Sequence, residues 1–80
     1  MKLEIITPEK RLFDGTVKLV QVPGTKGSFE VLKNHAPIIS TLTQGVIKVI
    51  TDKDQQQLIE INSGIIEVKA NIITILAVAK

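Results

Sequence analysis

The side chains that could support chemistry gather between Val22 and Thr41. This stretch reads VPGTKGSFEVLKNHAPIIST and contains a Pro-Gly turn, a second glycine three residues later and the only histidine of the chain, His35. A glycine-rich turn can expose backbone amides to an anion, and an imidazole can act as a base or a metal ligand. The stretch could therefore bind an anion or support acid–base chemistry if suitable partner residues accompany it.

His35 lacks the partners that catalysis needs. Nucleophilic catalysis through a histidine requires a serine or cysteine and an orienting carboxylate. No nucleophile motif surrounds His35, and the chain contains no cysteine. A lone histidine with separated carboxylates is also a poor site for zinc, which takes several such ligands. We therefore interpret His35 as structural or interfacial, and we expect no catalytic residue and no metal site.

The glycines of Gly24-Thr25-Lys26-Gly27 resemble a phosphate-binding loop only in part. The Gly-Lys-Ser/Thr ending is missing, and no helix follows whose N-terminus could hold a phosphate. A tight turn with positive φ accounts for both glycines better. Asp52 and Asp54, on an expected hairpin tip, supply too few oxygens for calcium. We therefore expect no cofactor and no bound nucleotide.

Composition argues against two further classes of partner. The net charge is +2, and lysines and arginines are scattered singly among aspartates and glutamates, so no basic stripe offers itself to nucleic acid. The chain has no Tyr, no Trp and two Phe, so it offers no platform for stacking bases. No apolar run approaches the length of a membrane span, and Met1-Lys2 leads into Leu3-Glu4-Ile5 rather than into a signal peptide. We expect synthesis in a bacterial type of cytoplasm, no nucleic-acid partner and no direct insertion into a membrane.

Turn signals punctuate the chain at the spacing of an all-β fold. They fall about 8 to 11 residues apart, at Gly15, Pro23-Gly24, Asn34, Gly45, Asp52-Lys53-Asp54, Ser63-Gly64 and Asn71. Between them, Ile, Val and Thr account for 28 of the 80 residues, and these branched side chains favour strands. The pattern predicts one domain over residues 1–80, a β-sandwich of two sheets with about ten strands.

Individual strands are expected at residues 2–7, 17–22, 45–51, 58–62, 65–69 and 72–77, with shorter ones around Leu12, Phe29 and Ile39. Alternation is clearest in two of them. Ile59 and Ile61 should face opposite to Leu58 and Glu60, and Ile66 and Val68 opposite to Glu67 and Lys69.

Adjacent apolar pairs recur within these strands, at Ile5-Ile6, Leu19-Val20, Ile38-Ile39, Ile65-Ile66 and Ile72-Ile73. Successive side chains of a strand point to opposite faces, so one member of each pair should face solvent. Single exposed aliphatics are ordinary. Several on one sheet would form an apolar patch of the kind that marks a protein interface. The residues themselves therefore indicate a binding module.

A carrier domain is the alternative. Lipoyl and biotinyl domains are small β-sandwiches that present one lysine at a hairpin tip, and Lys53 lies on an expected tip. Those families usually set the lysine in a Met-Lys-Met or Asp-Lys-Ala context, whereas Asp54 and three glutamines follow Lys53 here.

Longer motifs resemble a known family. Val22-Pro23-Gly24-x-x-Gly27, followed by Asn34-His35-Ala36-Pro37-Ile38-Ile39, closely resembles the N-terminal domain of the epsilon subunit of F-type ATP synthases. The opening Leu3-x-Ile5-Ile6-Thr7-Pro8-Glu9 and the closing hairpin around Ser63-Gly64 and Asn71 are similar to that family as well. The resemblance covers essentially the whole chain, in order.

This resemblance implies a ten-stranded sandwich in the central rotor stalk, bound to the gamma subunit and resting on the polar loops of the c-ring. Such a subunit couples proton translocation to ATP synthesis without doing chemistry itself, on the cytoplasmic side of a bacterial inner membrane. Carried over by position, the expected gamma-facing residues are Thr7, His35, Ala36, Pro37, Ile39 and Ser40. The loop expected to face the c-ring is Lys26, Gly27, Ser28, Phe29 and Glu30.

Two departures from the family stand out. The family commonly has glycine where this chain has Glu30, and an acidic or polar residue where it has Ser28. Most members also continue into a C-terminal helical hairpin that can block hydrolysis and, in some bacteria, binds ATP. This sequence stops at Lys80, so neither activity is expected of it, and a short subunit and a truncated one look alike.

Overall fold

The computed structural model describes residues 1–80 and contains strands but no helix. The seven strands are β1 (Lys2–Ile6), β2 (Arg11–Gly24), β3 (Gly27–Leu32), β4 (Ile38–Leu42), β5 (Gly45–Thr51), β6 (Gln56–Lys69) and β7 (Ile72–Ala79). The all-β prediction is confirmed. The structure therefore contains no helix that could cross a membrane.

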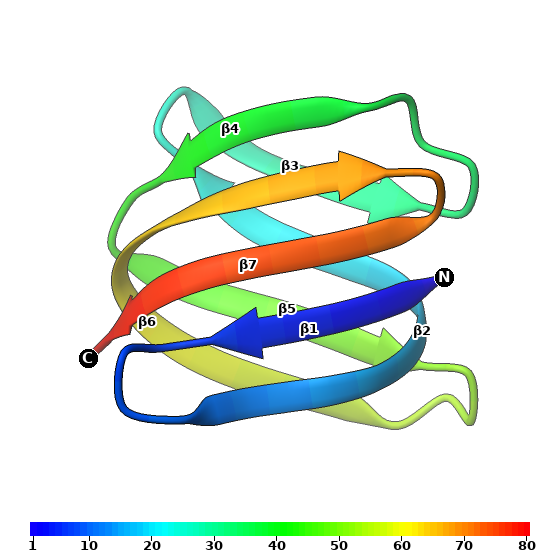
Figure 1. Ribbon diagram of the computed structural model, residues 1–80, viewed down its shortest axis with the longest axis horizontal. Helices are drawn as coiled ribbons and strands as arrows, with labels where there is room; N and C mark the ends of the chain where they lie inside the picture. The colour runs from blue at the N-terminus through cyan, green and yellow to red at the C-terminus, as the bar shows by residue number, and fades with distance from the viewer.

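The strands form two layers (Figure 1). One layer contains β4, the second half of β6, β7, β1 and the first half of β2; we call it the β7 layer. The other contains β3, the second half of β2, β5 and the first half of β6; we call it the β5 layer. Because β2 and β6 belong to both layers, hydrogen-bonded pairing runs in a closed ring from β1 through β2, β5, β6 and β7 back to β1.

The expected count of about ten strands is wrong, because the turn signals at Gly15 and Ser63-Gly64 lie inside strands. The chain bends there without reversing, so β2 and β6 each run for 14 residues through both layers. Each long strand contains an irregularity of register, between Val17 and Leu19 in β2 and between Ile61 and Ser63 in β6. Small residues and bulges permit such bends while pairing continues on either side.

The remaining turn signals hold. Asn34, Asp54 and Asn71 all have positive φ in connections between strands, and Gly27, the first residue of β3, has φ 127°. Gly24 does not have the positive φ expected of it. A Cβ there would lie 2.6 Å from the carbonyl oxygen of Gly27 and 2.9 Å from the ring of Phe29, so close approach of backbone and ring explains this glycine instead.

Fifteen aliphatic residues fill the space between the layers. Ile61, Ile66 and Val68 are among them, and Leu58, Glu60 and Glu67 are exposed, which confirms both predicted alternations. In each adjacent pair one member is more exposed than the other, as expected. The more exposed members are Ile6, Leu19, Ile39, Ile65 and Ile72.

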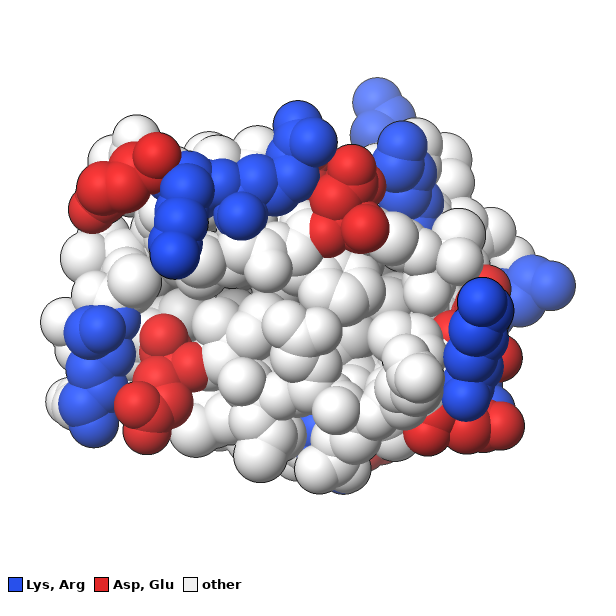
Figure 2. Space-filling model, turned by 90° about the horizontal axis from the view of Figure 1, so that it is seen from below, with Lys and Arg blue, Asp and Glu red and all other residues white.

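Charged side chains of both signs are mixed on the surface. Figure 2 shows the lower side of the molecule as seen in Figure 1, with lysines and arginines set next to aspartates and glutamates toward its edges and none across its centre. Pairs such as Lys18 with Asp54 and Arg11 with Glu4 contribute to this mixture. This face carries no large field of one sign.

The bends make a prediction for the two glycines. A Cβ on Gly64 would lie 2.8 Å from the carbonyl oxygen of Leu76, whereas a Cβ on Gly15 would meet only the ring of Phe13 at 3.5 Å. Replacement of Gly64 by alanine should therefore lower the free energy of unfolding by about 1–3 kcal/mol. Gly15→Ala is the matched control and should change it by less than about 0.5 kcal/mol. Urea unfolding of both variants tests this, and equal effects would refute the assigned packing.

Candidate protein-interaction surface

A row of aliphatic side chains crosses the outer face of the β7 layer. Leu76 of β7 pairs in register with Ile65 of β6 on one side and with Ile6 of β1 on the other. Leu76 is 54% exposed and Ile65 47% exposed. Side chains directly opposite on neighbouring strands lie in contact range. The three residues therefore form one continuous strip.

Two further exposed aliphatics lie beside this row on the same face. Val78 follows Leu76 on β7, and Ile39 of β4, at 72% exposure, is the most exposed large aliphatic of the chain. Ile39 pairs in register with Glu67, and Glu67 pairs with Thr74, so a polar row runs beside the aliphatic one. We call Ile6, Ile39, Ile65, Leu76 and Val78 the aliphatic strip. An apolar centre with a polar border is typical of protein interfaces.

An open hollow lies at one end of the strip. It has a volume of about 350 Å³, and its lining is mostly apolar, from Ile6, Thr7, Pro8, Leu76, Ala77 and Val78. Such a depression can take one large apolar side chain of a partner, the arrangement that concentrates binding energy at interfaces.

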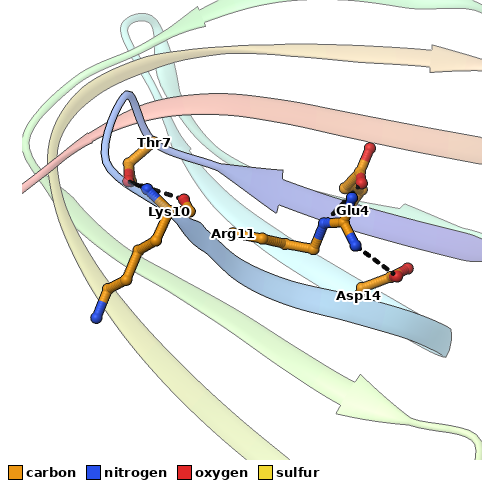
Figure 3. A network of polar contacts seen from close by, with 5 residues as sticks. All are labelled: Glu4, Thr7, Lys10, Arg11 and Asp14. Carbon is orange, nitrogen blue, oxygen red and sulfur yellow. Dashed lines mark hydrogen bonds and ion pairs between the residues drawn. The ribbon is translucent and has the colours of Figure 1, made fainter.

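Thr7, expected to face gamma, is buried at 6% exposure. Its hydroxyl donates to the carbonyl oxygen of Lys10 at 2.9 Å and accepts from the Lys10 backbone amide at 3.1 Å (Figure 3). The Thr7 amide also donates to the Lys10 carbonyl. The polar groups of Thr7 thus close the turn between β1 and β2, and its methyl-bearing side is what remains for the hollow.

Arg11 holds the next part of the same connection. Its guanidinium pairs with Glu4 at 3.0 Å and with Asp14 at 3.3 Å (Figure 3). Glu4 and Asp14 are directly opposite each other on β1 and β2, where like charges repel. Arg11 offsets this repulsion, although all three side chains are partly exposed and such pairs add little stability.

His35 lies in the connection between β3 and β4, half-buried. Its Nδ1 donates to the carbonyl oxygen of Ala36 at 2.7 Å, and its backbone amide donates to Leu32. Ala36 and Pro37 follow it and are exposed. The ring is therefore oriented by its own loop and has no carboxylate or nucleophile among its hydrogen-bond partners.

The stretch from Lys26 to Glu30, expected as a loop, is the end of the short turn after β2 followed by the first residues of β3 (Gly27–Leu32), because β2 and β3 pair as far as Gly24 and Gly27. This end of the β2–β3 hairpin is fastened to the end of β4. The Thr25 and Thr41 hydroxyls are 2.9 Å apart, and the Thr25 amide donates to the Thr41 carbonyl. Lys26, Ser28 and Glu30 are exposed, whereas Phe29 turns inward and packs against the core. Phe29 therefore packs beneath the hairpin end, and only part of its ring is exposed to solvent.

The structure brings six of the eleven predicted residues together, and His35, Ala36, Pro37, Glu30 and Thr7 are not among them. Lys26, Gly27, Ser28 and Phe29 line one open hollow with Ile39 and Ser40. Thr7 lies elsewhere, because β6 and β7 separate β1 from β4, a distance of roughly 14 Å across three strand spacings. Sequence reasoning missed Leu76 and Val78, which the alternation of the last strand could have flagged. No group of three or more His, Cys, Asp or Glu side chains is placed to hold a metal ion.

Nearly the whole chain matches a known protein family. A family model described as "ATP synthase, Delta/Epsilon chain, beta-sandwich domain" matches residues 1–79. The chain belongs to this family. The family match favours a subunit of this type over the lipoyl- or biotinyl-carrier alternative, although Lys53 does lie exposed between β5 and β6.

Relatives named "ATP synthase epsilon chain" are similar along nearly all of this sequence. One from Rhodopseudomonas palustris is 42% identical over 92% of this chain and 54% of its own length. One from Leptospira interrogans is 38% identical over 95% of this chain and 59% of its own length. The chain therefore spans just over half the length of these family members.

Two solved structures share the fold. A chain of the Euglena gracilis mitochondrial ATP synthase, in a structure of OSCP, F1 and c-ring, has a TM-score of 0.85 at 18% identity, covering 95% of this chain and 49% of its own. A chain from the central stalk and c-ring of the Tetrahymena thermophila enzyme has a TM-score of 0.80 at 20% identity, covering 98% and 63%. At these identities the similarity shows the family fold.

The two hydrogen bonds of the Thr7 hydroxyl make a stability prediction. Thr7→Val keeps the shape of the side chain but removes both bonds to Lys10, so the free energy of unfolding should fall by about 1–2 kcal/mol. Thr7→Ser keeps the hydroxyl and should retain most of that stability. Thermal and urea unfolding of the pair measure this, and a valine variant as stable as the serine variant would contradict the assigned role.

Proposed function

We propose that this chain is a central-stalk, or rotor, subunit of an F-type ATP synthase, linking the gamma subunit to the c-ring. In this role it couples proton translocation to ATP synthesis and is not itself catalytic. It acts at the cytoplasmic side of the bacterial inner membrane as a peripheral part of the complex. The observation that carries the proposal is the aliphatic strip on a sandwich of this family.

The strip is the proposed contact with gamma. Its five members are aliphatic. Four of them lie on strands of the closed ring, and Ile39 lies on β4, which pairs with β6, so little ordering accompanies binding. Ile39 belongs both to the strip and to the expected gamma-facing set with His35, Ala36, Pro37 and Ser40. Thr7 contributes to this contact by shaping the hollow beside Leu76.

The end of the β2–β3 hairpin, from Lys26 to Glu30, is the proposed contact with the polar loops of the c-ring. Lys26, Ser28 and Glu30 offer one positive, one neutral and one negative polar group at this exposed hairpin end. The bonds between Thr25 and Thr41 tie this hairpin end to β4. A force on the hairpin end is therefore passed directly to the strand that carries Ile39.

Complex formation with the cognate gamma subunit tests the proposal. The two proteins should co-elute as a 1:1 complex in gel filtration at micromolar concentration. Leu76→Gln should weaken that complex about tenfold or more, because it removes an apolar side chain from the contact. Leu58→Gln is the matched control, since Leu58 is 59% exposed on the β5 layer and pairs with Lys48.

Separate elution of the parent chain and gamma would overturn the proposed role. Equal weakening by the two glutamine variants would leave gamma as the partner but would remove the aliphatic strip as its binding surface. Circular dichroism is the control for folding. Both variants should remain folded, because both side chains are more than half exposed.

A further inference from the structure

The loop that carries His35 is held in place by a residue far away in the sequence. Asn71, in the turn between β6 and β7, accepts a hydrogen bond from the Asn34 backbone amide to its Oδ1 at 2.7 Å. Its Nδ2 donates to the Asn34 Oδ1 at 3.0 Å. The two asparagines are 37 positions apart, and this second bond joins their side chains directly. We call this pair the asparagine clasp.

The clasp supplies the only hydrogen bonds between residues 33–37 and another element. The other bonds of this loop are short-range ones, from the His35 amide to Leu32 and from the His35 ring to Ala36. Most of the loop is exposed, so packing adds little. Without the clasp, only its two ends and these short-range bonds would fix the loop that presents His35 and Pro37.

Asn71 is itself rigidly placed. Ala70 and Asn71 both have positive φ, at 52° and 62°, as the two central residues of a type I′ hairpin turn do. Lys69 and Ile72 close the turn as a register pair, and the carbonyl oxygen of Asn71 accepts a hydrogen bond from the Lys2 amide of β1. The clasp therefore ties the loop to two strands of the β7 layer, which also carries the aliphatic strip.

The backbone of Asn34 fits the same purpose. Its φ is 65°, in the left-handed region that asparagine and aspartate enter more readily than other residues with side chains. Both asparagines thus combine an unusual backbone conformation with a side-chain partner. A positive φ alone would shape each turn, so the hydrogen bonds between the two residues are an additional feature.

We propose that Asn71 is a positioning residue for partner binding: through the clasp it holds His35, Ala36 and Pro37 in register with the aliphatic strip before gamma arrives. This inference rests on the proposed function. The clasp removes disorder from the free loop, so binding requires less ordering. Its effect should therefore appear in affinity and in local mobility, and far less in global stability.

Aspartate substitutions test direct pairing. In Asn71→Asp, one carboxylate oxygen still accepts from the Asn34 amide, and the rotated Asn34 side chain can donate to the other. In Asn34→Asp, the carboxylate accepts from Nδ2 of Asn71. Each single variant should bind gamma within about twofold of the parent. The double variant places two carboxylates against each other and should bind about five- to tenfold more weakly.

A neutral variant separates loss of the clasp from added charge. Asn71→Gly tolerates the positive φ of the turn, so the hairpin remains, but it cannot bond to Asn34. We expect weakening similar to that of the double aspartate variant, with the melting temperature kept. Hydrogen exchange at the amides of Asn34 and His35 should accelerate in both, while exchange at core strands stays unchanged.

The decisive measurement is a calorimetric titration of cognate gamma with the parent and the four variants. A double aspartate variant that binds like the parent, or whose loss is the sum of the two single losses, overturns the clasp's role while gamma binding stands. A fall in melting temperature matching the loss of affinity also overturns it, because it assigns Asn71 to the fold alone. A parent chain that does not bind gamma overturns the proposed function and this inference together.

Discussion

An unpaired residue near the bend of each long strand sets which side chains on either side of it face the core. Along β6, Ile61 and Ile66 both face the core although they are an odd number of positions apart. Strict alternation would forbid this, and the irregularity of register between Ile61 and Ser63 permits it. The same device between Val17 and Leu19 lets Val17 and Val20 both point inward. Ile65 and Leu19 face outward for the same reason.

Local patterns were enough to predict the fold class and the alternation of two strands. Branched residues, alternation around Ile66 and turn residues such as Asn34 and Asn71 act over a few positions and are visible in the sequence. The strand count failed at Gly15 and Gly64, because a glycine serves a bend as well as a reversal. Only the pairing on both sides distinguishes these outcomes, and pairing is a tertiary property.

The candidate site, too, could be predicted from the sequence only in part. Paired aliphatics predicted that one member of each pair would be exposed, yet which member it is and what lies next to it across the sheet depend on register between distant segments. The burial of Thr7 and the inward turn of Phe29 follow from packing that the motif does not encode. The contact between Asn34 and Asn71 joins positions with no local relation, so no short-range pattern could have announced it.

The first strand completes its pairing with the last. β1 lies parallel to β7, with Lys2 opposite Ile72 and Ile5 opposite Ile75, so the ring of strands closes only through residues at opposite ends of the sequence. On a ribosome, Leu3 and Ile5 are made before β7 and remain without this neighbour until β7 has emerged. Two core aliphatics therefore stay accessible to other chains or to chaperones while the strands between β1 and β7 are synthesised. Such long-range closure favours slow folding, and the nascent chain stays vulnerable until β7 has paired with β1.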